Sequence, residues 1–205
     1  MHPDRLAAQL QYLEQNPSID LVDNWSYLID MEGRVVGLRR LPEPNITLRD
    51  VVRGPVILNG SSLGRMQMYR DNPFDPTLRR AEDWEMWIRA FQNHRFGRIH
   101  EPLYFRRCIR SEGGRTFELK EFRNLAYVRR ILLRHGPRLI GWRQTLLAMG
   151  EFHARFVVRT VLSLLRLQRL RPQSKQINMT DHEIAQAEEI LKRILNVRVP
   201  GLEPL

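Results

Sequence analysis

The chain is poor in cysteine, and this shortage limits the chemistry open to it. Cysteine occurs once, at Cys108, so neither an internal disulfide nor a cysteine zinc site can form. We therefore expect the protein in the cytosol, or peripherally at the inner face of the cell membrane. No basic start precedes an apolar run, so we expect no signal peptide. No stretch reaches about 18 uninterrupted apolar residues, which excludes an ordinary membrane span.

Glycine and proline are also scarce, at 12 each among 205 residues, too few for a collagen-like or low-complexity chain. The hydrophobic fraction of 42% and the charged fraction of 27% are those of a globular protein. The length suffices for one domain of ordinary size with its own core. A wholly disordered chain is excluded.

Positive charge is concentrated in the second half of the chain. Residues 1–105 contain 13 arginines and 14 acids, a net charge of −1, whereas residues 106–205 contain 20 basic residues and 9 acids, a net charge of +11. This asymmetry indicates two roles. Thirty of the 33 basic residues are arginine, which prefers phosphate and carboxylate partners. Codon bias in a GC-rich genome explains the same excess equally well.

The pattern predicts an α/β fold: a small mixed sheet with flanking helices, followed by a mostly helical tail. Leu6, Leu10 and Leu13 recur at helical spacing after Pro3, and Asn16-Pro17 ends that helix. We expect strands at residues 19–22, 27–30, 34–37, 56–58, 62–66, 96–99 and 103–105, with a turn at residues 101–102. Thr47 is expected to cap a short helix.

The remaining helices follow from apolar spacing and from capping signals. Trp84, Trp87, Ile88 and Phe91 form one stripe at i, i+3, i+4 and i+7. Further helices are expected at residues 116–135, ending near Gly136-Pro137, at residues 139–170, and after the capping box of Thr180 and Glu183, with Ile184, Ala187, Leu191, Ile194 and Leu195 on one face. The expected units are residues 1–111, a basic extension at 112–171, and a linker with a terminal helix at 172–205.

The acid pair Glu82-Asp83 stands where the Trp84 helix begins. A helix N-terminus favours carboxylates through its dipole and its unpaired N–H groups, so capping alone would explain the pair. A carboxylate held at the mouth of a cleft is also suited to take a proton from a hydroxyl nucleophile. The adjacent tryptophans fit either the core or a platform on which a sugar ring stacks. The residues themselves leave these alternatives open.

Five segments resemble, in order and spacing, signature segments of family 2 glycosyltransferases. Residues 2–9 resemble the P-x-R-L-x-x-Q helix, and residues 16–20 and 29–33 resemble the strand and hairpin after it. Residues 59–65 resemble the H-x-S-x-M-x-R strand, residues 82–89 the ED-aromatic…LW-R helix, and residues 101–106 the EPLY-YR strand. The similarity covers residues 1 to about 111. It implies the acceptor-side half of a GT-A fold, which transfers a sugar from a nucleotide-sugar to a hydroxyl with inversion, in glycan or cell-surface polysaccharide synthesis.

Carried over by motif, the resemblance makes Asp83 the general base and Glu82 its neighbour, which orients the acceptor or the structure. The implied acceptor-binding residues are Trp84, Ser61, Arg65 and Arg106. Lipid-linked glycans are frequent acceptors in this family. The family's histidine after the YR arginine is missing, because Arg107 and Cys108 follow Arg106.

The family's metal-binding aspartates normally precede the P-x-R-L helix, which here begins at residue 2. We therefore expect no nucleotide-sugar or metal ligands in this chain, although the family uses a divalent metal, Mg or Mn. We also expect the chain to be an N-terminally truncated transferase that is inactive alone.

The basic tail has several interpretations. Residues 106–171 contain 16 basic residues and 4 acids, and arginines interrupt the apolar stretch at residues 156–167. Such a helix can lie on an anionic membrane, or it can pack its apolar face on the sheet. A non-catalytic interaction module derived from a transferase is a further alternative. No nucleic acid is expected as a partner, because aromatic residues are not interleaved with the arginines and no nucleic-acid motif is present.

Overall fold

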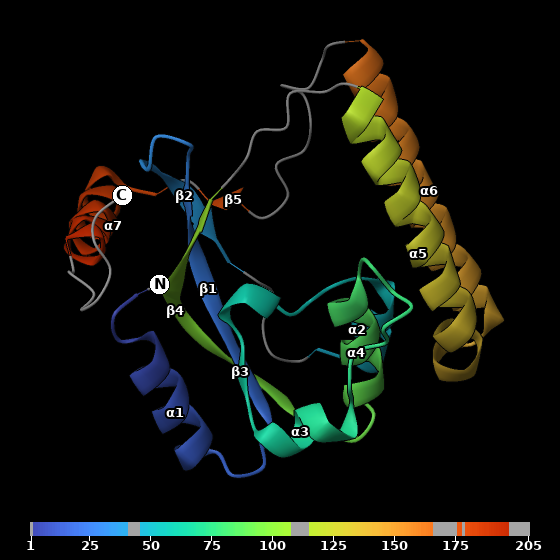
Figure 1. Ribbon diagram of the computed structural model, residues 1–205, viewed down its shortest axis with the longest axis horizontal. Coiled ribbons are helices and arrows are strands. Elements are labelled where there is room, and N and C mark those ends of the chain that lie inside the picture. Colours follow the sequence, from blue (N-terminus) through green and yellow to red (C-terminus); the bar gives the residue numbers. More distant parts are fainter. Residues whose placement is uncertain (1, 41–45, 108–114, 166–175, 178, 197–205) are drawn as a thin grey trace.

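The computed structural model describes residues 2–40, 46–107, 115–165, 176–177 and 179–196. Figure 1 shows a mixed sheet with helices on its flanks and a long pair of helices beyond them. The expected fold class, a mixed α/β sheet followed by a mainly helical C-terminal region, is confirmed. Among the described helices, none is long and apolar enough to cross a membrane.

Strand β1 (Leu21–Ile29) is the centre of the sheet. One edge pairs in parallel with β4 (Phe96–Arg107), from Leu21 opposite Phe96 to Ile29 opposite Arg107. The other edge pairs antiparallel, first with β3 (Leu63–Gly64) and then with β2 (Val35–Arg39). Strand β5 (Gln176–Ile177) adds to β2. Central parallel strands are covered on both faces, and β1 is accordingly buried along most of its length.

Several short elements lie where local signals placed them. Helix α1 (Arg5–Gln15) ends before Asn16-Pro17, and β1 and β2 form the expected hairpin. Helix α2 (Leu48–Arg53) begins at Thr47, whose side chain accepts the N–H of Asp50 in a capping box. Helix α4 (Glu82–Ala90) contains the tryptophan stripe. These signals act over three or four residues, so distant packing does not change them.

Of the two strands predicted around Asn59-Gly60, the first is absent, and the second is confirmed only at its centre, where β3 (Leu63–Gly64) lies. Residues 56–58 form no strand, a short 3-10 helix, η1 (Asn59–Ser61), follows them, and α3 (Met66–Asp71) begins at Met66. The reason is a side chain: the N–H of Leu58 donates to Oδ2 of Asp23 at 3.0 Å rather than to a neighbouring strand. The break predicted at residues 101–102 is also absent. Pro102 lies opposite Trp25, where the register of β4 shifts, so the missing N–H of proline is accommodated there.

Helices α5 (Arg115–Ile140) and α6 (Trp142–Leu164) form an antiparallel hairpin (Figure 1). The predicted end at Gly136-Pro137 was wrong, because α5 continues through Pro137 to Ile140. Gly141, at φ +81°, makes the turn. Gly136 serves packing instead: a Cβ there would lie 2.5 Å from Oγ1 of Thr145. A single proline late in a helix costs one backbone hydrogen bond, which the contacts along the hairpin offset.

The hairpin shares the main core with the sheet. Figure 1 shows α2 and α4 between the sheet and the hairpin. Buried side chains of all these layers pack together, among them Leu21, Val51, Trp87, Ile131 and Ala148. The described part of the expected extension at residues 112–171 is therefore packed against the first unit. The expected boundary between residues 111 and 112 lies outside the described residues.

Helix α7 (Asp181–Leu195) covers a second, smaller core. Ala187 and Leu191 pack against Ile29, Val35 and Phe105 of the sheet. Thr180 and Glu183 form the predicted capping box. Leu195 was expected on the same apolar face, but it is 73% exposed in the last turn of the helix. The start of the expected linker, at residues 172–175, lies outside the described residues.

Candidate active site

The candidate site lies where α4 begins. Ala81, directly before the helix, has φ 56° and ψ 22°, the left-handed region that few residues other than glycine adopt. The chain turns there, and Glu82, Asp83 and Glu85 all fall in the first helical turn. Unpaired N–H groups and the helix dipole make this end favourable for negative charge. The structure therefore places the predicted acid pair at a helix N-terminus, as the sequence indicated.

Asp83 is a half-buried carboxylate with increased basicity. Burial raises its pKa above the ordinary aspartate value, the negative charge of Glu82 raises it further, and the N–H of Trp84 lowers it in part. That N–H donates to Oδ1 of Asp83 at 2.8 Å. A raised pKa makes an ionised carboxylate a better proton acceptor than an ordinary aspartate. Partial burial and raised basicity together distinguish Asp83 from an ordinary surface carboxylate.

Both tryptophans of α4 belong to the core. Trp84 is 2% exposed, its Nε1 donates to the carbonyl of Val51 at 2.6 Å, and its ring lies 5.6 Å from that of Phe152 in α6. Trp87 is 1% exposed and meets Phe96 edge to face. Neither ring presents a face to solvent, so in this structure Trp84 is not accessible to an acceptor sugar. Its contacts hold the start of α4 against α2 and α6.

The other three predicted acceptor residues lie apart from α4. Ser61 in η1 is fully buried, and its Oγ lies within hydrogen-bond distance of the carbonyl oxygens of Asn24 (3.3 Å) and Leu58 (3.2 Å), which share its single O–H donor. Arg65 donates to two carbonyls near α1 and β1, those of Ile19 and Leu13. Arg106 is exposed near the end of β4. Among the described residues, no hydrogen bond or ion pair joins Asp83 to Ser61, Arg65 or Arg106. Of the six site residues predicted from the sequence, only Glu82, Asp83 and Trp84 therefore lie together.

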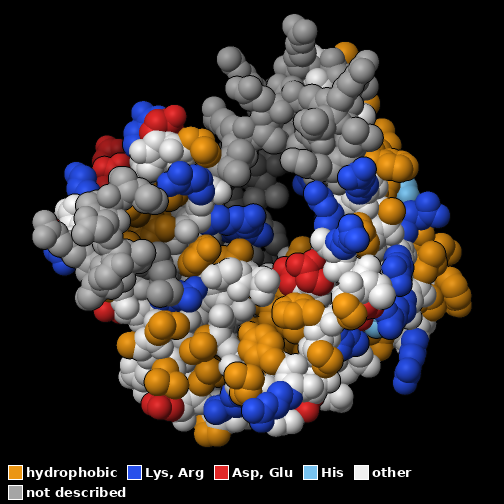
Figure 2. All heavy atoms as spheres, in the orientation of Figure 1, with side chains coloured by type: hydrophobic (Ala, Val, Ile, Leu, Met, Phe, Trp, Pro, Cys, Tyr) orange, Lys and Arg blue, Asp and Glu red, His pale blue; other side chains and the backbone are white. Residues whose placement is uncertain are grey.

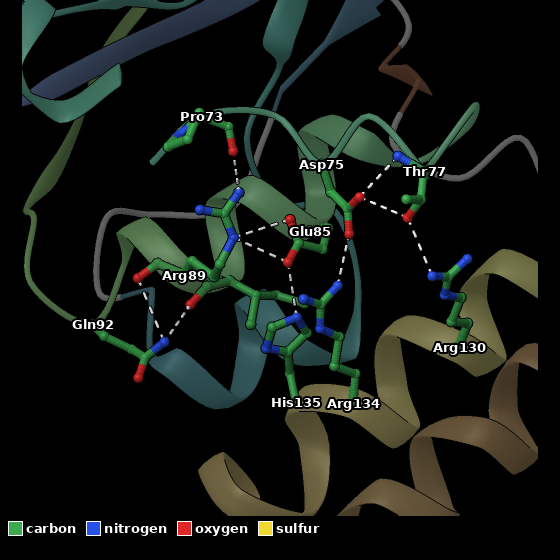
Figure 3. A network of polar contacts seen from close by, with 10 residues as sticks. Pro73, Asp75, Thr77, Glu85, Arg89, Gln92, Arg130, Arg134 and His135 are labelled. Atoms are coloured by element: carbon green, nitrogen blue, oxygen red, sulfur yellow. Dashed lines mark hydrogen bonds and ion pairs between the residues drawn. The ribbon is translucent and has the colours of Figure 1, made fainter. Parts of the chain in front are cut away.

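Behind the acid pair, Glu85 is the centre of a polar network that the sequence did not reveal (Figure 3). Its side chain is 1% exposed, and both carboxylate oxygens lie 3.0 Å from Nε of Arg89. Nε2 of His135, in α5, lies 2.9 Å from Oε1. Burial alone would raise the pKa of Glu85, but the contacts with His135 and Arg89 outweigh it and hold the pKa below its ordinary value. Glu85 is therefore ionised and joins α4 to α5.

The loop before α4 is held by the same face of α5. Asp75 accepts the N–H of Thr77 at 2.9 Å, its Oγ1–H at 2.6 Å and an N–H of Arg134 at 2.7 Å. These contacts lower the pKa of Asp75 to about 2. Arg130 donates to Oγ1 of Thr77 at 3.1 Å (Figure 3). Helix α5 thus fixes both α4 and the segment that leads into it.

The sequence contained part of the signal for this network. Glu85 and Arg89 stand at i, i+4, the ordinary spacing of a helical ion pair. His135 stands 50 residues further along the chain and gave no sign of its partner. A contact between distant segments becomes visible only when the layers are assembled.

The described residues do not fit the divalent metal that the resemblance implies. Among them, no group of three or more His, Cys, Asp or Glu side chains converges in a way that could hold a metal ion. Glu82 and Asp83 would supply two carboxylates, and the third acid of the turn, Glu85, is engaged by Arg89 and His135.

Comparison with known proteins gives a partial match. No protein-family model matches the chain. The chain is similar to an uncharacterized glycosyltransferase of Methanocaldococcus jannaschii, with 27% identity over 106 residues. The match covers 49% of this chain and 36% of that relative. The chain thus spans little more than a third of the length of the relative.

Proposed function

We propose that this chain is the acceptor-side part of a family 2 glycosyltransferase with a GT-A fold. In this proposal it transfers a sugar from a nucleotide-sugar to a hydroxyl acceptor, with inversion, during glycan or cell-surface polysaccharide synthesis. The observation that carries the proposal is the half-buried Asp83, with its raised pKa, at the N-terminus of α4. The five motif segments and the partial similarity to a glycosyltransferase support it.

Asp83 would act as the base. The acceptor oxygen attacks the anomeric carbon and forms the new glycosidic bond, while its proton passes to a carboxylate oxygen of Asp83. The bond between that carbon and the nucleoside diphosphate breaks, and the diphosphate leaves with the electron pair. Asp83 then releases its proton to water. A general base at such a step contributes about 10²–10⁴ in rate.

The neighbouring residues would serve this step in different ways. Glu82 adds negative charge beside Asp83, which raises its basicity and helps to position the acceptor hydroxyl. Arg106 is exposed and can contact the acceptor. Ser61 and Arg65 would act indirectly, because their hydrogen bonds hold the segment between β1 and α3. In this proposal, the nucleotide-sugar and the divalent metal are bound on the donor side of the transferase, outside the described residues.

The test joins a donor-binding domain of a family 2 glycosyltransferase to the N-terminus of the chain. Release of nucleoside diphosphate is then measured with and without a glycan acceptor. Asp83→Asn keeps the shape of the side chain but cannot accept the proton, so acceptor-dependent turnover should fall by about 10²–10⁴. Glu82→Gln is the matched control, because it removes the adjacent charge and leaves the base in place.

Normal turnover of the folded Asp83→Asn variant would reduce Asp83 to a helix cap and contradict the proposal. A larger loss with Glu82→Gln than with Asp83→Asn would move the base to the other carboxylate of the pair.

A further inference from the structure

One side of α6 is apolar and exposed. Six of its side chains are between 45% and 62% exposed: Trp142, Leu146, Leu147, Val157, Val158 and Val161. Their spacing places them on the same side of the helix. The opposite side is already packed, because Ala148 is fully buried and Phe152 contacts the core. Among the described residues, none covers this exposed side, which we call the α6 face.

The α6 face is a larger apolar surface than isolated exposed side chains form. It extends from Trp142 to Val161, about 28 Å at a rise of 1.5 Å per residue. Around Gly150, Leu146 and Leu147 border a shallow depression that Arg143 also lines. Single exposed apolar side chains are normal in a monomer, whereas several of them on one side of a helix form an apolar patch that marks an interaction surface.

The described part of the helical hairpin is strongly basic. Residues 122–165 contain eight arginines and one acid, Glu151, and two of these arginines, Arg130 and Arg134, contact the loop before α4. That acid is ion-paired with Arg53 and Arg155, so it presents little uncompensated negative charge. Figure 2 shows basic and hydrophobic side chains intermixed along the edge of the molecule formed by α5 and α6. Arg143 and Arg159 are also exposed on α6.

We propose that the α6 face docks on a membrane surface containing anionic lipids. The apolar side chains would enter the boundary between headgroups and acyl chains, to a depth of about 5–10 Å, with the helix parallel to the bilayer. The arginines would extend their charged ends to lipid phosphates while their aliphatic stems cover apolar surface. This inference stands independently of the proposed transferase activity.

Charge argues for a lipid surface over the alternatives. A second copy packed face to face would bring the arginines of both hairpins together, and like charges in contact disfavour such a dimer. A nucleic acid would neutralise the arginines but leave Leu146, Val157 and Val161 exposed to water. An anionic bilayer complements both features at once.

Trp142 provides a direct optical probe of this docking. It is 62% exposed, whereas Trp84 and Trp87 are at most 2% exposed. The fourth tryptophan, Trp25, is partly exposed but lies in β1 of the sheet, so contact of the α6 face with lipid changes chiefly the environment of Trp142. The full chain is mixed with vesicles of phosphatidylcholine alone or of phosphatidylcholine with phosphatidylglycerol. We expect flotation with the anionic vesicles, a blue shift of tryptophan emission, and quenching by brominated lipids. Trp142→Phe should abolish the shift, and added salt should weaken flotation.

Two double variants separate the apolar and electrostatic contributions. Val157→Ser with Val161→Ser keeps the net charge and should abolish the blue shift. Its matched control is Leu6→Ser with Leu10→Ser, which removes apolar side chains of similar exposure from α1 and should bind normally.

Arg143→Gln with Arg155→Gln should lower the partition coefficient by about 25-fold, at about fivefold for each arginine. The matched control, Arg70→Gln with Arg79→Gln, makes the same change in net charge away from the α6 face. All these side chains are exposed, so the variants should fold.

Several outcomes would overturn the proposal. The first is no binding of the full chain to anionic vesicles, and the second is binding that Val157→Ser with Val161→Ser leaves unchanged. Sedimentation showing a dimer that this variant dissociates would assign the α6 face to a second copy. Salt-sensitive binding to random DNA without vesicle binding would assign the arginines to nucleic acid.

Discussion

Asp23 on β1 and Arg98 on β4 form a buried, two-point ion pair across the parallel strands. Nε of Arg98 lies 2.6 Å from Oδ1 of Asp23, and Nη2 lies 2.8 Å from Oδ2. The two side chains are 0% and 1% exposed. Each also holds the segment before η1, Asp23 through the N–H of Leu58 and Arg98 through the carbonyl of Val56. The pair therefore ties a loop to the sheet as well as one strand to another.

Removing one partner of this pair should cost far more stability than removing both. Asp23→Ala leaves the Arg98 guanidinium buried without its carboxylate, and we expect a loss of about 3–5 kcal/mol in the free energy of unfolding. Asp23→Leu combined with Arg98→Met removes both charges and should recover much of that loss. Urea denaturation of the single and double variants measures the coupling. Additive losses would contradict a direct partnership.

Glu85→Gln should destabilise the protein in a pH-dependent way. Glutamine keeps the shape but loses the charge that Arg89 and His135 contact, a loss of about 2 kcal/mol. Because the pKa of Glu85 is lowered on folding, its contribution is fully present above about pH 4.5 and disappears as the pH falls through the folded value. The difference in Tm between wild type and variant should therefore be constant near neutral pH and shrink in acid. A difference that grows in acid would contradict this assignment.

Asp83→Asn should not lower stability at neutral pH. The pKa of Asp83 is raised on folding, so the folded protein holds this proton more tightly than the unfolded chain does. The ionised side chain is therefore slightly destabilising at pH 7, and the neutral amide should leave Tm unchanged or slightly higher. The difference should vanish as the pH falls through the raised pKa. Calorimetry of the two proteins between about pH 4 and pH 8 tests this. A clear loss of Tm at pH 7 would show that helix capping dominates at this position.

Trp84→Phe should affect stability without affecting acceptor affinity. The variant loses the hydrogen bond to Val51 and leaves a void beside Phe152, at a cost of about 2 kcal/mol. Thermal unfolding measures the cost, and acceptor titration of the chain joined to a donor-binding domain, as in the test of the proposed function, measures the affinity. Trp142→Phe is the control, because its exposed ring contributes little to the core. A raised acceptor KM with unchanged Tm would return Trp84 to an acceptor-binding role.

Local signals in the sequence predicted the fold better than distant ones. The caps at Thr47 and Thr180 and the stripe of α4 depend on neighbours within one turn, and all three are confirmed. Helix α5 continues through Pro137 because it packs against α6, and a single helix contains no sign of that contact. For the same reason the strands predicted on either side of residues 101–102 are continuous, since β1 supports them along their whole length.

In the candidate site too, the sequence predicted local features and missed contacts between distant segments. The dipole argument located Glu82 and Asp83 correctly at the start of a helix. The burial of Trp84 was not predictable, because it depends on a contact with Phe152 in α6, which is distant in the sequence. Arg65 has the residue type of a ligand contact, yet its donors satisfy the carbonyls of Leu13 and Ile19. The type of a side chain does not reveal which of its partners the fold brings within reach.

The attachment of α4 to the hairpin has a further consequence. Trp84 and Glu85 follow Asp83 directly and contact α6 and α5, so the carboxylate of Asp83 and the α6 face belong to one rigid unit. Under both proposals, the fold then fixes the distance between the Asp83 carboxylate and the lipid headgroups. Under the same two proposals, a membrane-anchored glycan would be an acceptor only if its terminal hydroxyl lies at that distance from the membrane. Shorter or longer glycans would not bring their hydroxyl to Asp83.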